Sequence, residues 1–200
     1  CGGTELGCTN DDGFFFSLTS GTTYVLRLAE RADFAGLINF DIEAFEVIEN
    51  NDCTSAIEAP VGVVAPTTID FDSRGATESM DASCDNAAQT NMDAWYEITM
   101  PFDGDLEVTN ANNITRITVF DACGGIELSC FSGNSTVFGL AGGVTYYLRA
   151  ARRAEFANED PFDIQALPAP LPTCTTTTEW ISGAWDNGTP DLSTNVIIRS

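Results

Sequence analysis

The feature that most constrains the fold of this 200-residue chain is an internal repeat. The first eight residues, CGGTELGC, return as CGGIELSC at residues 123–130. At this offset, Cys1 to Phe45 aligns with Cys123 to Leu167 without a gap, and about half of the aligned positions are identical. Self-similarity of this extent indicates tandem copies of one structural unit.

The two copies are not equally complete. The second copy has a leading half, about residues 51–122, for which the first copy has no counterpart. The sequence therefore predicts three parts: residues 1–49 as the trailing half of a module, residues 50–171 as a complete module, and residues 172–200 as a linker and the start of another β-rich module. Because half a sheet leaves unpaired strand edges, we expect residues 1–49 to be completed by something outside this range.

The local pattern is that of β-strands. Apolar and polar residues alternate in Asp105–Thr109, Arg116–Val119 and Val144–Ala150 at the period of a half-buried strand. Further short apolar or alternating runs are bounded by turn-forming residues: FFFSL, LINFDIEAF, WYEITM and PFDIQAL. Since no long amphipathic helix is evident, we predict an all-β fold of tandem antiparallel β-sandwich modules, jelly-roll-like, with the first module truncated.

Seven cysteines are present, and none has the CxxC spacing of zinc or redox sites. Two pairs occupy equivalent places in the repeated motif, so each pair is expected to close on itself. This reasoning predicts a Cys1–Cys8 bond and a Cys123–Cys130 bond. A Cys53–Cys84 bond then follows by elimination, and Cys174 has no predicted partner. Disulfides persist in oxidising compartments, so we expect an extracellular or cell-surface protein.

The charge balance excludes several functions. Thirty acidic residues face eight basic ones, all of them arginine, for a net charge of −22. A surface this negative disfavours binding to nucleic acid. No apolar run approaches the length that a membrane-spanning helix needs. Without histidine or lysine there is no Ser-His-Asp triad and no Schiff-base nucleophile. Carboxylate chemistry or hard-cation binding remains, and no pair of carboxylates stands out as a glycosidase pair, so we expect no enzyme activity.

The order of motifs in the complete module resembles a known family. The motifs are Asn51-Asp52-Cys53, Asp93-Ala94-Trp95-Tyr96-Glu97-Ile98-Thr99-Met100-Pro101, Thr118-Val119-Phe120-Asp121-Ala122-Cys123-Gly124-Gly125 and Gly143-Val144-Thr145-Tyr146-Tyr147-Leu148-Arg149. They look like the β-sandwich repeats of large secreted and surface proteins of the Bacteroidota, which are similar to pre-peptidase C-terminal domains. After Cys174, the stretch around Trp180 and Trp185 resembles segments of proteins exported by type IX secretion. The resemblance implies export, surface display or adhesion, and carries over no catalytic residue.

Calcium is the cation that the side-chain oxygens of this chain would suit. The candidate ligands are Asn51 and Asp52 at the module junction, Asp11 and Asp12 in the turn after Cys8, and Asp93 near the Cys84 loop. The alternative is that these are solvated turn residues, which are common at such positions.

Two arginines recur at the same strand position. Arg27 aligns with Arg149, and Asp41 aligns with Asp163 a short distance further along each copy. We expect an ion pair within each module, Arg27 with Asp41 and Arg149 with Asp163, that fixes strand register; a ligand-binding arginine is the alternative.

These features predict a non-catalytic structural or adhesive repeat of a large exported cell-surface protein. The alternatives are an accessory module of a secreted hydrolase and a subunit of an extracellular filament. The expected partners are neighbouring modules of the same polypeptide, adjacent subunits, or a surface glycan or protein, without nucleic acid and without membrane insertion.

Overall fold

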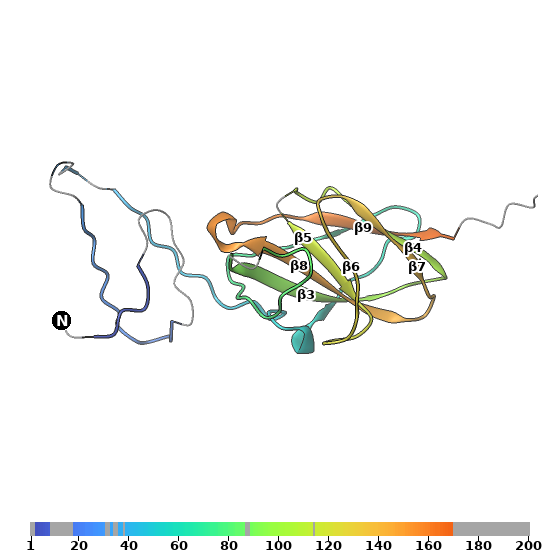
Figure 1. Cartoon of the computed structure of the whole chain (residues 1–200), viewed down its shortest axis with the longest axis horizontal. Coiled ribbons are helices and arrows are strands. Elements are labelled where there is room, and N and C mark those ends of the chain that lie inside the picture. Colours follow the sequence, from blue (N-terminus) through green and yellow to red (C-terminus); the bar gives the residue numbers. More distant parts are fainter. Residues whose placement is uncertain are drawn as a thin grey trace, which may run out of the picture. The chain divides into compact units, whose positions relative to one another are not determined.

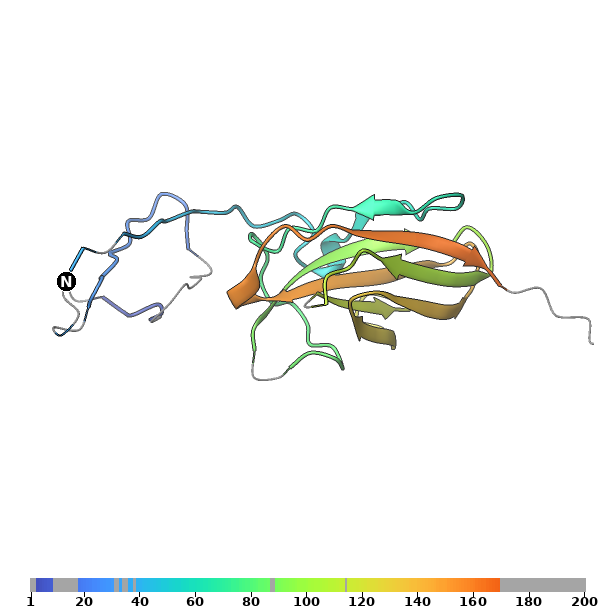
Figure 2. The same cartoon turned by 90° about the horizontal axis from the view of Figure 1, so that it is seen from above.

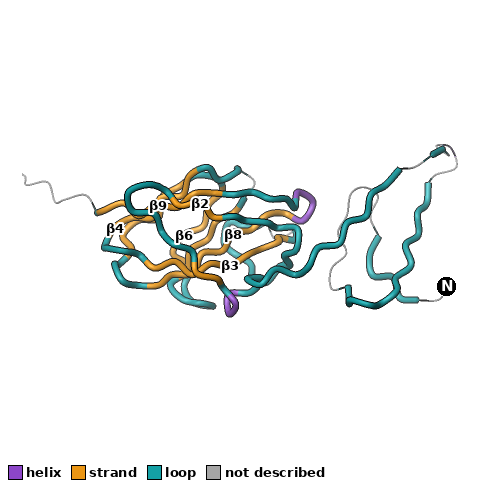
Figure 3. Tube along the Cα trace, turned by 180° about the vertical axis from the view of Figure 1, so that it is seen from behind, coloured by secondary structure: helices purple, strands orange, loops and turns teal. Residues whose placement is uncertain are grey.

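The structure is a computed structural model that describes residues 3–8, 18–30, 33, 36–37, 39–86, 89–113 and 115–169. All the strands in this part of the chain lie between residues 57 and 168 (Figure 1). They form the predicted all-β, largely antiparallel sandwich. The helical elements of the described sandwich are two short 3-10 helices, η2 (Cys53–Ser55) and η3 (Ala154–Phe156), drawn in purple in Figure 3.

Sheet A contains five strands in the order β1-β3-β8-β5-β6. Their bounds are β1 Ile57–Glu58, β3 Asn91–Thr99, β8 Thr145–Arg153, β5 Arg116–Phe120 and β6 Glu127–Ser132. β1 runs parallel to β3, and the other neighbours are antiparallel. The long strands β3 and β8 lie at its centre, where both of their edges are paired.

Sheet B contains four strands in the order β2-β9-β4-β7. Their bounds are β2 Thr67–Ile69, β9 Phe162–Pro168, β4 Gly104–Thr109 and β7 Ser135–Leu140. Figure 2 shows β2, β9 and β4 following one another in this order. All the pairs in this sheet are antiparallel.

The main core lies between the two sheets, where alternate residues of each strand point inward. Sheet A contributes Ile98, Ile117 and Leu148, and sheet B contributes Leu106 and Ile164, all of them buried. In β4 the alternation seen in the sequence is the alternation between core and surface. In β5 and β8 the inward residues enter the same core, but the outward residues Thr118 and Arg149 are buried as well.

The predicted strands of the first copy are not formed in the described residues. Residues 39–47 include most of the LINFDIEAF run, yet no strand is assigned there. FFFSL lies almost entirely outside the described residues. The physical reason is that β9, the counterpart of residues 40–45, hydrogen-bonds to β2 and β4, and both belong to the leading half that the first copy lacks.

Candidate functional site

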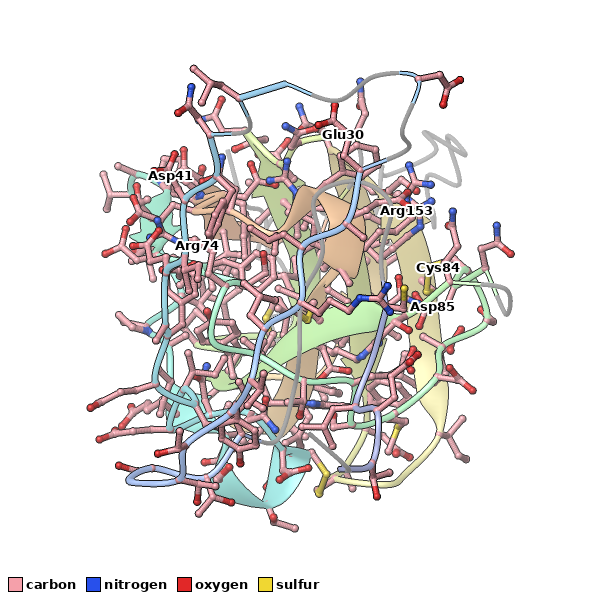
Figure 4. All side chains as sticks on the ribbon, turned by 90° about the vertical axis from the view of Figure 1, so that its left-hand side faces the viewer. Glu30, Asp41, Arg74, Cys84, Asp85 and Arg153 are labelled. Atoms are coloured by element: carbon pink, nitrogen blue, oxygen red, sulfur yellow. A yellow bond between two sulfur atoms is a disulfide. The ribbon has the colours of Figure 1, made fainter. Side chains whose placement is uncertain are left out.

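The outer face of sheet A is covered by a segment of the leading half, residues 79–85, which we name the strap. The strap begins at β3, where the Ser79 hydroxyl donates to Asp93 Oδ1 (2.7 Å) and accepts from Trp95 Nε1 (2.8 Å). It ends at β6, where Cys84 is bonded to Cys130. Figure 4 shows Cys84 and Asp85 next to each other on this loop, with disulfide sulfur atoms nearby. The strap therefore crosses the sheet from β3 to β6.

Arg149 of β8 is buried beneath the strap, with no exposed side-chain surface. Its Nε donates to Asp93 Oδ2 at 2.7 Å, and its Nη1 donates to Asp85 Oδ2 at 2.8 Å. Both carboxylates are buried as well. Asp93 comes from the neighbouring strand and Asp85 from the end of the strap, so one guanidinium group ties the strap to the centre of sheet A.

The polar groups of this cluster are not all satisfied. Arg149 Nη2 and Asp85 Oδ1 are buried without a hydrogen-bond partner. Burial raises the pKa of the Asp93 carboxyl group, whereas Arg149 and Ser79 act in the opposite direction. Arg149 binds the carboxylates of Asp93 and Asp85. This arrangement holds the strap against sheet A.

The disulfide pairing predicted from the repeat is wrong for the complete module. Cys53 is bonded to Cys123, with Cα atoms 5.4 Å apart, and Cys84 is bonded to Cys130, with Cα atoms 5.6 Å apart. The predicted Cys53–Cys84 and Cys123–Cys130 bonds are therefore absent. Each bond instead joins the leading half to the trailing half: Cys53 of η2 is bonded to Cys123 after β5, and Cys84 of the strap is bonded to Cys130 of β6.

The remaining cysteines belong to the flanking parts. Cys8 is exposed and has no disulfide partner among the described residues. Cys1 and Cys174 lie outside the described residues. The predicted Cys1–Cys8 bond stays a prediction.

In the complete module, Arg149 forms its ion pairs with other carboxylates than the predicted one. Arg149 does form an ion pair within the module, but with Asp93 and Asp85 and not with Asp163. Asp163 lies on sheet B, where Thr68 Oγ1 donates to its Oδ1 (2.6 Å) and Asn110 donates to its Oδ2. These hydrogen bonds, first the one from Thr68, lower the pKa of Asp163. In the first copy, Arg27 and Asp41 are both exposed and no ion pair joins these two described residues.

The calcium-ligand candidates among the described residues form hydrogen bonds with other protein groups. Asp93 is bonded to Arg149, and the Asn51 side chain donates to Thr77 Oγ1 (2.7 Å) and accepts from Thr77 N (2.6 Å). Asp52 precedes η2, where its backbone carbonyl accepts from Ser55. No group of three or more His, Cys, Asp or Glu in the described residues is placed to hold a metal ion. Asp11 and Asp12 lie outside these residues, and calcium binding at Asn51 and Asp52 stays a prediction.

Most of the large aromatic side chains of β3 and β8, on which a sugar ring could otherwise stack, are buried. Trp95 packs under the strap with Phe120, their ring centroids 5.5 Å apart, and Tyr96 belongs to the main core. Burial raises the pKa of Tyr96 to about 12. Tyr147 faces outward and its hydroxyl donates to Glu97 Oε1 (2.9 Å).

One groove lies beside the open edge of the sandwich, between β6 and β7. It has a volume of about 510 Å³, and its lining includes Leu128, Phe138, Tyr146 and Asp121. Phe138 is 76% exposed although it is a large aromatic residue. This surface combines an exposed ring with hydroxyl and carboxylate oxygens, which is a combination that suits ligand binding.

Ser79 is the residue of the strap that sequence reasoning missed. The strap has no hydrophobic periodicity, and the contacts that fasten it to sheet A join residues at least 14 positions apart. The sequence feature that could have indicated the strap is Cys84, which is followed by the acidic Asp85, a suitable ion-pair partner for an arginine of the trailing half.

The fold and the strap define a disulfide-stapled, antiparallel β-sandwich module. In comparison with known families, a family described as "Galactose binding domain-like" matches residues 1–42 and 49–164, more than half of the 200 residues. The chain therefore belongs to the galactose-binding-like domains associated with the type IX secretion system. No curated protein and no solved structure matches it.

Membership in this family makes the chain an accessory module of a secreted or cell-surface protein. Among the described residues, no helix has the length and apolar character needed to cross a membrane.

Proposed function

We propose that the chain is a non-catalytic structural repeat of a large exported cell-surface protein, in which each module extends the polypeptide outward from the cell. The observation that carries this proposal is where the chain enters and leaves the sandwich. It enters beside Arg74, whose guanidinium group stacks over the Phe45 ring and also binds Glu159 just before β9. It leaves at the other end of β9, where Ala169 N donates to Asp103 O (3.4 Å).

Entry and exit are thus separated by the length of β9. Its seven residues span roughly 20 Å at about 3.3 Å per residue. Figure 1 shows the chain arriving at one end of the sandwich and β9 pointing toward the other. Modules connected in this way follow one another in series, which favours a spacer or stalk.

The disulfides determine how such a module carries tension. Cys53 lies close to the entry point and is bonded to Cys123, at a sequence separation of 70 residues. Force applied at the two ends therefore passes through this bond and bypasses most of the leading half.

Single-molecule extension of the 200-residue chain, held at its two termini, tests the proposal. In oxidising buffer we expect a resolved unfolding step whose length excludes the segment between Cys53 and Cys123. After reduction the same module should release about 240 Å more, the extended length of 70 residues at 3.3–3.6 Å each. A chain that extends without a resolved step when oxidised would not serve as a load-bearing spacer, and the proposal would then be wrong.

A second candidate function is adhesion to a surface glycan or protein, and the groove between β6 and β7 favours it. An exposed aromatic ring beside oxygen-bearing side chains can stack on a sugar ring while the oxygens accept hydrogen bonds. Asp121 gives the groove a negative charge, so we expect neutral or cationic ligands.

A glycan array probed in the presence and in the absence of Ca²⁺ tests this second function. We expect Phe138→Ala to abolish any binding seen with the unaltered chain. Phe156→Ala is the matched control, because Phe156 is also exposed (42%) but lies on η3, outside the groove. Equal loss in both variants, or no binding by the unaltered chain, would exclude glycan binding through this groove. The hydrolase-accessory and filament alternatives stay predictions.

A further inference from the structure

In addition to its paired strands, the trailing half of the complete module, residues 123–167, is fastened to the leading half by three links that involve its cysteines or its fully buried arginine. Two of them are the Cys53–Cys123 and Cys84–Cys130 bonds. The third is the ion pair of Arg149 with Asp93 and Asp85. Every cysteine of the trailing half is thus bonded to the leading half, and carboxylates of the leading half neutralise its fully buried Arg149.

The first copy carries the same three groups. Cys1, Cys8 and Arg27 align with Cys123, Cys130 and Arg149 of the complete module. Arg27 is exposed, whereas Arg149 is buried. Cys8 is exposed and without a disulfide partner among the described residues, whereas Cys130 is bonded.

The core positions of the first copy are also uncovered. Leu18, Leu26, Phe40 and Ile42 are exposed by 49%, 50%, 50% and 72%. Their counterparts in the complete module are Leu140, Leu148, Phe162 and Ile164, exposed by 4%, 1%, 0% and 0%. In the complete module these side chains are covered by the core of which β3, β4 and β5 of the leading half form part.

The first copy already has one local feature of the folded module. Thr19 N donates to the Tyr24 hydroxyl at 2.8 Å, and the equivalent Ala141 N donates to the Tyr146 hydroxyl at 2.9 Å. The turn between these residues contains a glycine with positive φ in both copies, 77° at Gly21 and 73° at Gly143, a conformation that favours glycine. The turn therefore has the same local conformation in both copies, although its apolar side chains are covered in only one of them.

We propose that the described residues 18–30 and 39–45 of the first copy form a docking surface for a leading half-module, a polypeptide segment built like residues 50–122 of this chain. Cys8 bonds to the cysteine of that segment that corresponds to Cys84, and Cys1 bonds to the one that corresponds to Cys53. Arg27 donates hydrogen bonds to the two carboxylates that correspond to Asp93 and Asp85. The apolar residues of the first copy then become core residues of a second sandwich.

The covalent step is an oxidation of thiols. Each new bond joins two cysteine sulfurs, which together lose two protons and two electrons. A disulfide oxidant such as oxidised glutathione accepts them and leaves as two thiols.

The test refolds the reduced 200-residue chain together with an isotope-labelled peptide of residues 50–122 in a glutathione redox buffer. Mass spectrometry of the non-reduced product then identifies the bonds. We expect a one-to-one covalent adduct in which chain Cys8 is bonded to peptide Cys84 and chain Cys1 to peptide Cys53. The label separates these bonds from those that the chain makes with its own Cys53 and Cys84.

Two variants make the test specific. Cys8→Ser should remove the bond to peptide Cys84 and retain the bond between Cys1 and peptide Cys53. A peptide carrying Asp85→Asn and Asp93→Asn keeps both cysteines but leaves Arg27 unneutralised, so we expect a lower yield of adduct. A bond between Cys1 and Cys8 within the chain, an absence of adduct, or adducts formed equally through all cysteines would each overturn the proposal.

Discussion

At the scale of single residues, Arg149 accounts for much of how the module is held together. A buried guanidinium group has a large desolvation cost, which close carboxylates with good hydrogen-bond geometry offset. Asp93 and Asp85 supply these at 2.7 and 2.8 Å. Removing the arginine would leave two carboxylates buried without a counter-charge.

We therefore expect Arg149→Met to lower the free energy of unfolding by about 3–5 kcal/mol, the range for breaking a buried ion pair. Urea unfolding followed by tryptophan fluorescence measures this change, since Trp95 lies under the strap. Arg116→Met is the matched control: Arg116 lies on the neighbouring β5 and donates to Ser132 Oγ at 2.6 Å near the surface. Its loss should cost about 1 kcal/mol or less.

A triple variant separates the loss of charge pairing from the loss of packing. Arg149→Met combined with Asp85→Asn and Asp93→Asn leaves no unpaired buried charge, so most of the stability should return. If the single variant is as stable as the unaltered protein, Arg149 is not the buried partner of these two carboxylates.

At the scale of elements, the sequence predicts the strands of the complete module well. β4, β5 and β8 follow from the alternation of apolar and polar residues, because one face of each strand packs in the main core. The strap could not be predicted in this way, since it has no periodic pattern and its contacts join residues far apart in the sequence. For the same reason the sequence did not show that Asp93, a candidate calcium ligand, is hydrogen-bonded to an arginine 56 residues away.

The disulfide pairing failed for a related reason. Comparison of the two copies examines only the trailing half that they share, so it favoured bonds within that half. Four cysteines allow three pairings, and the sequence does not choose among them. The partner of Arg149 was missed likewise, because Asp93 and Asp85 belong to the half that is present once.

Strand formation in the trailing half likewise depends on residues of the leading half. Residues 39–45 carry the pattern of β9, but β9 is a strand because β2 and β4 pair with it. A trailing half therefore has the sequence of strands without the partners that would make it a sheet.

At the scale of the whole molecule, the complete module is a closed unit whose two halves are joined by two disulfides and a buried ion pair. This explains how a sandwich with a short β1 and an open edge at β6 and β7 is stabilised outside the cell. In the chain-entropy account, bonds enclosing 46 and 70 residues contribute about 4 kcal/mol each. The same links support the proposed role of the module as a spacer that bears tension.

The central claim is that these disulfides run between the halves, and direct mapping of the bonds tests it. The non-reduced chain is digested with trypsin and with a protease that cleaves after glutamate, because Glu127 lies between Cys123 and Cys130 and Glu58 lies between Cys53 and Cys84. Mass spectrometry should then find one cross-linked pair containing Cys53 and Cys123 and another containing Cys84 and Cys130. Recovery of Cys123 bonded to Cys130, and Cys53 bonded to Cys84, would contradict the account.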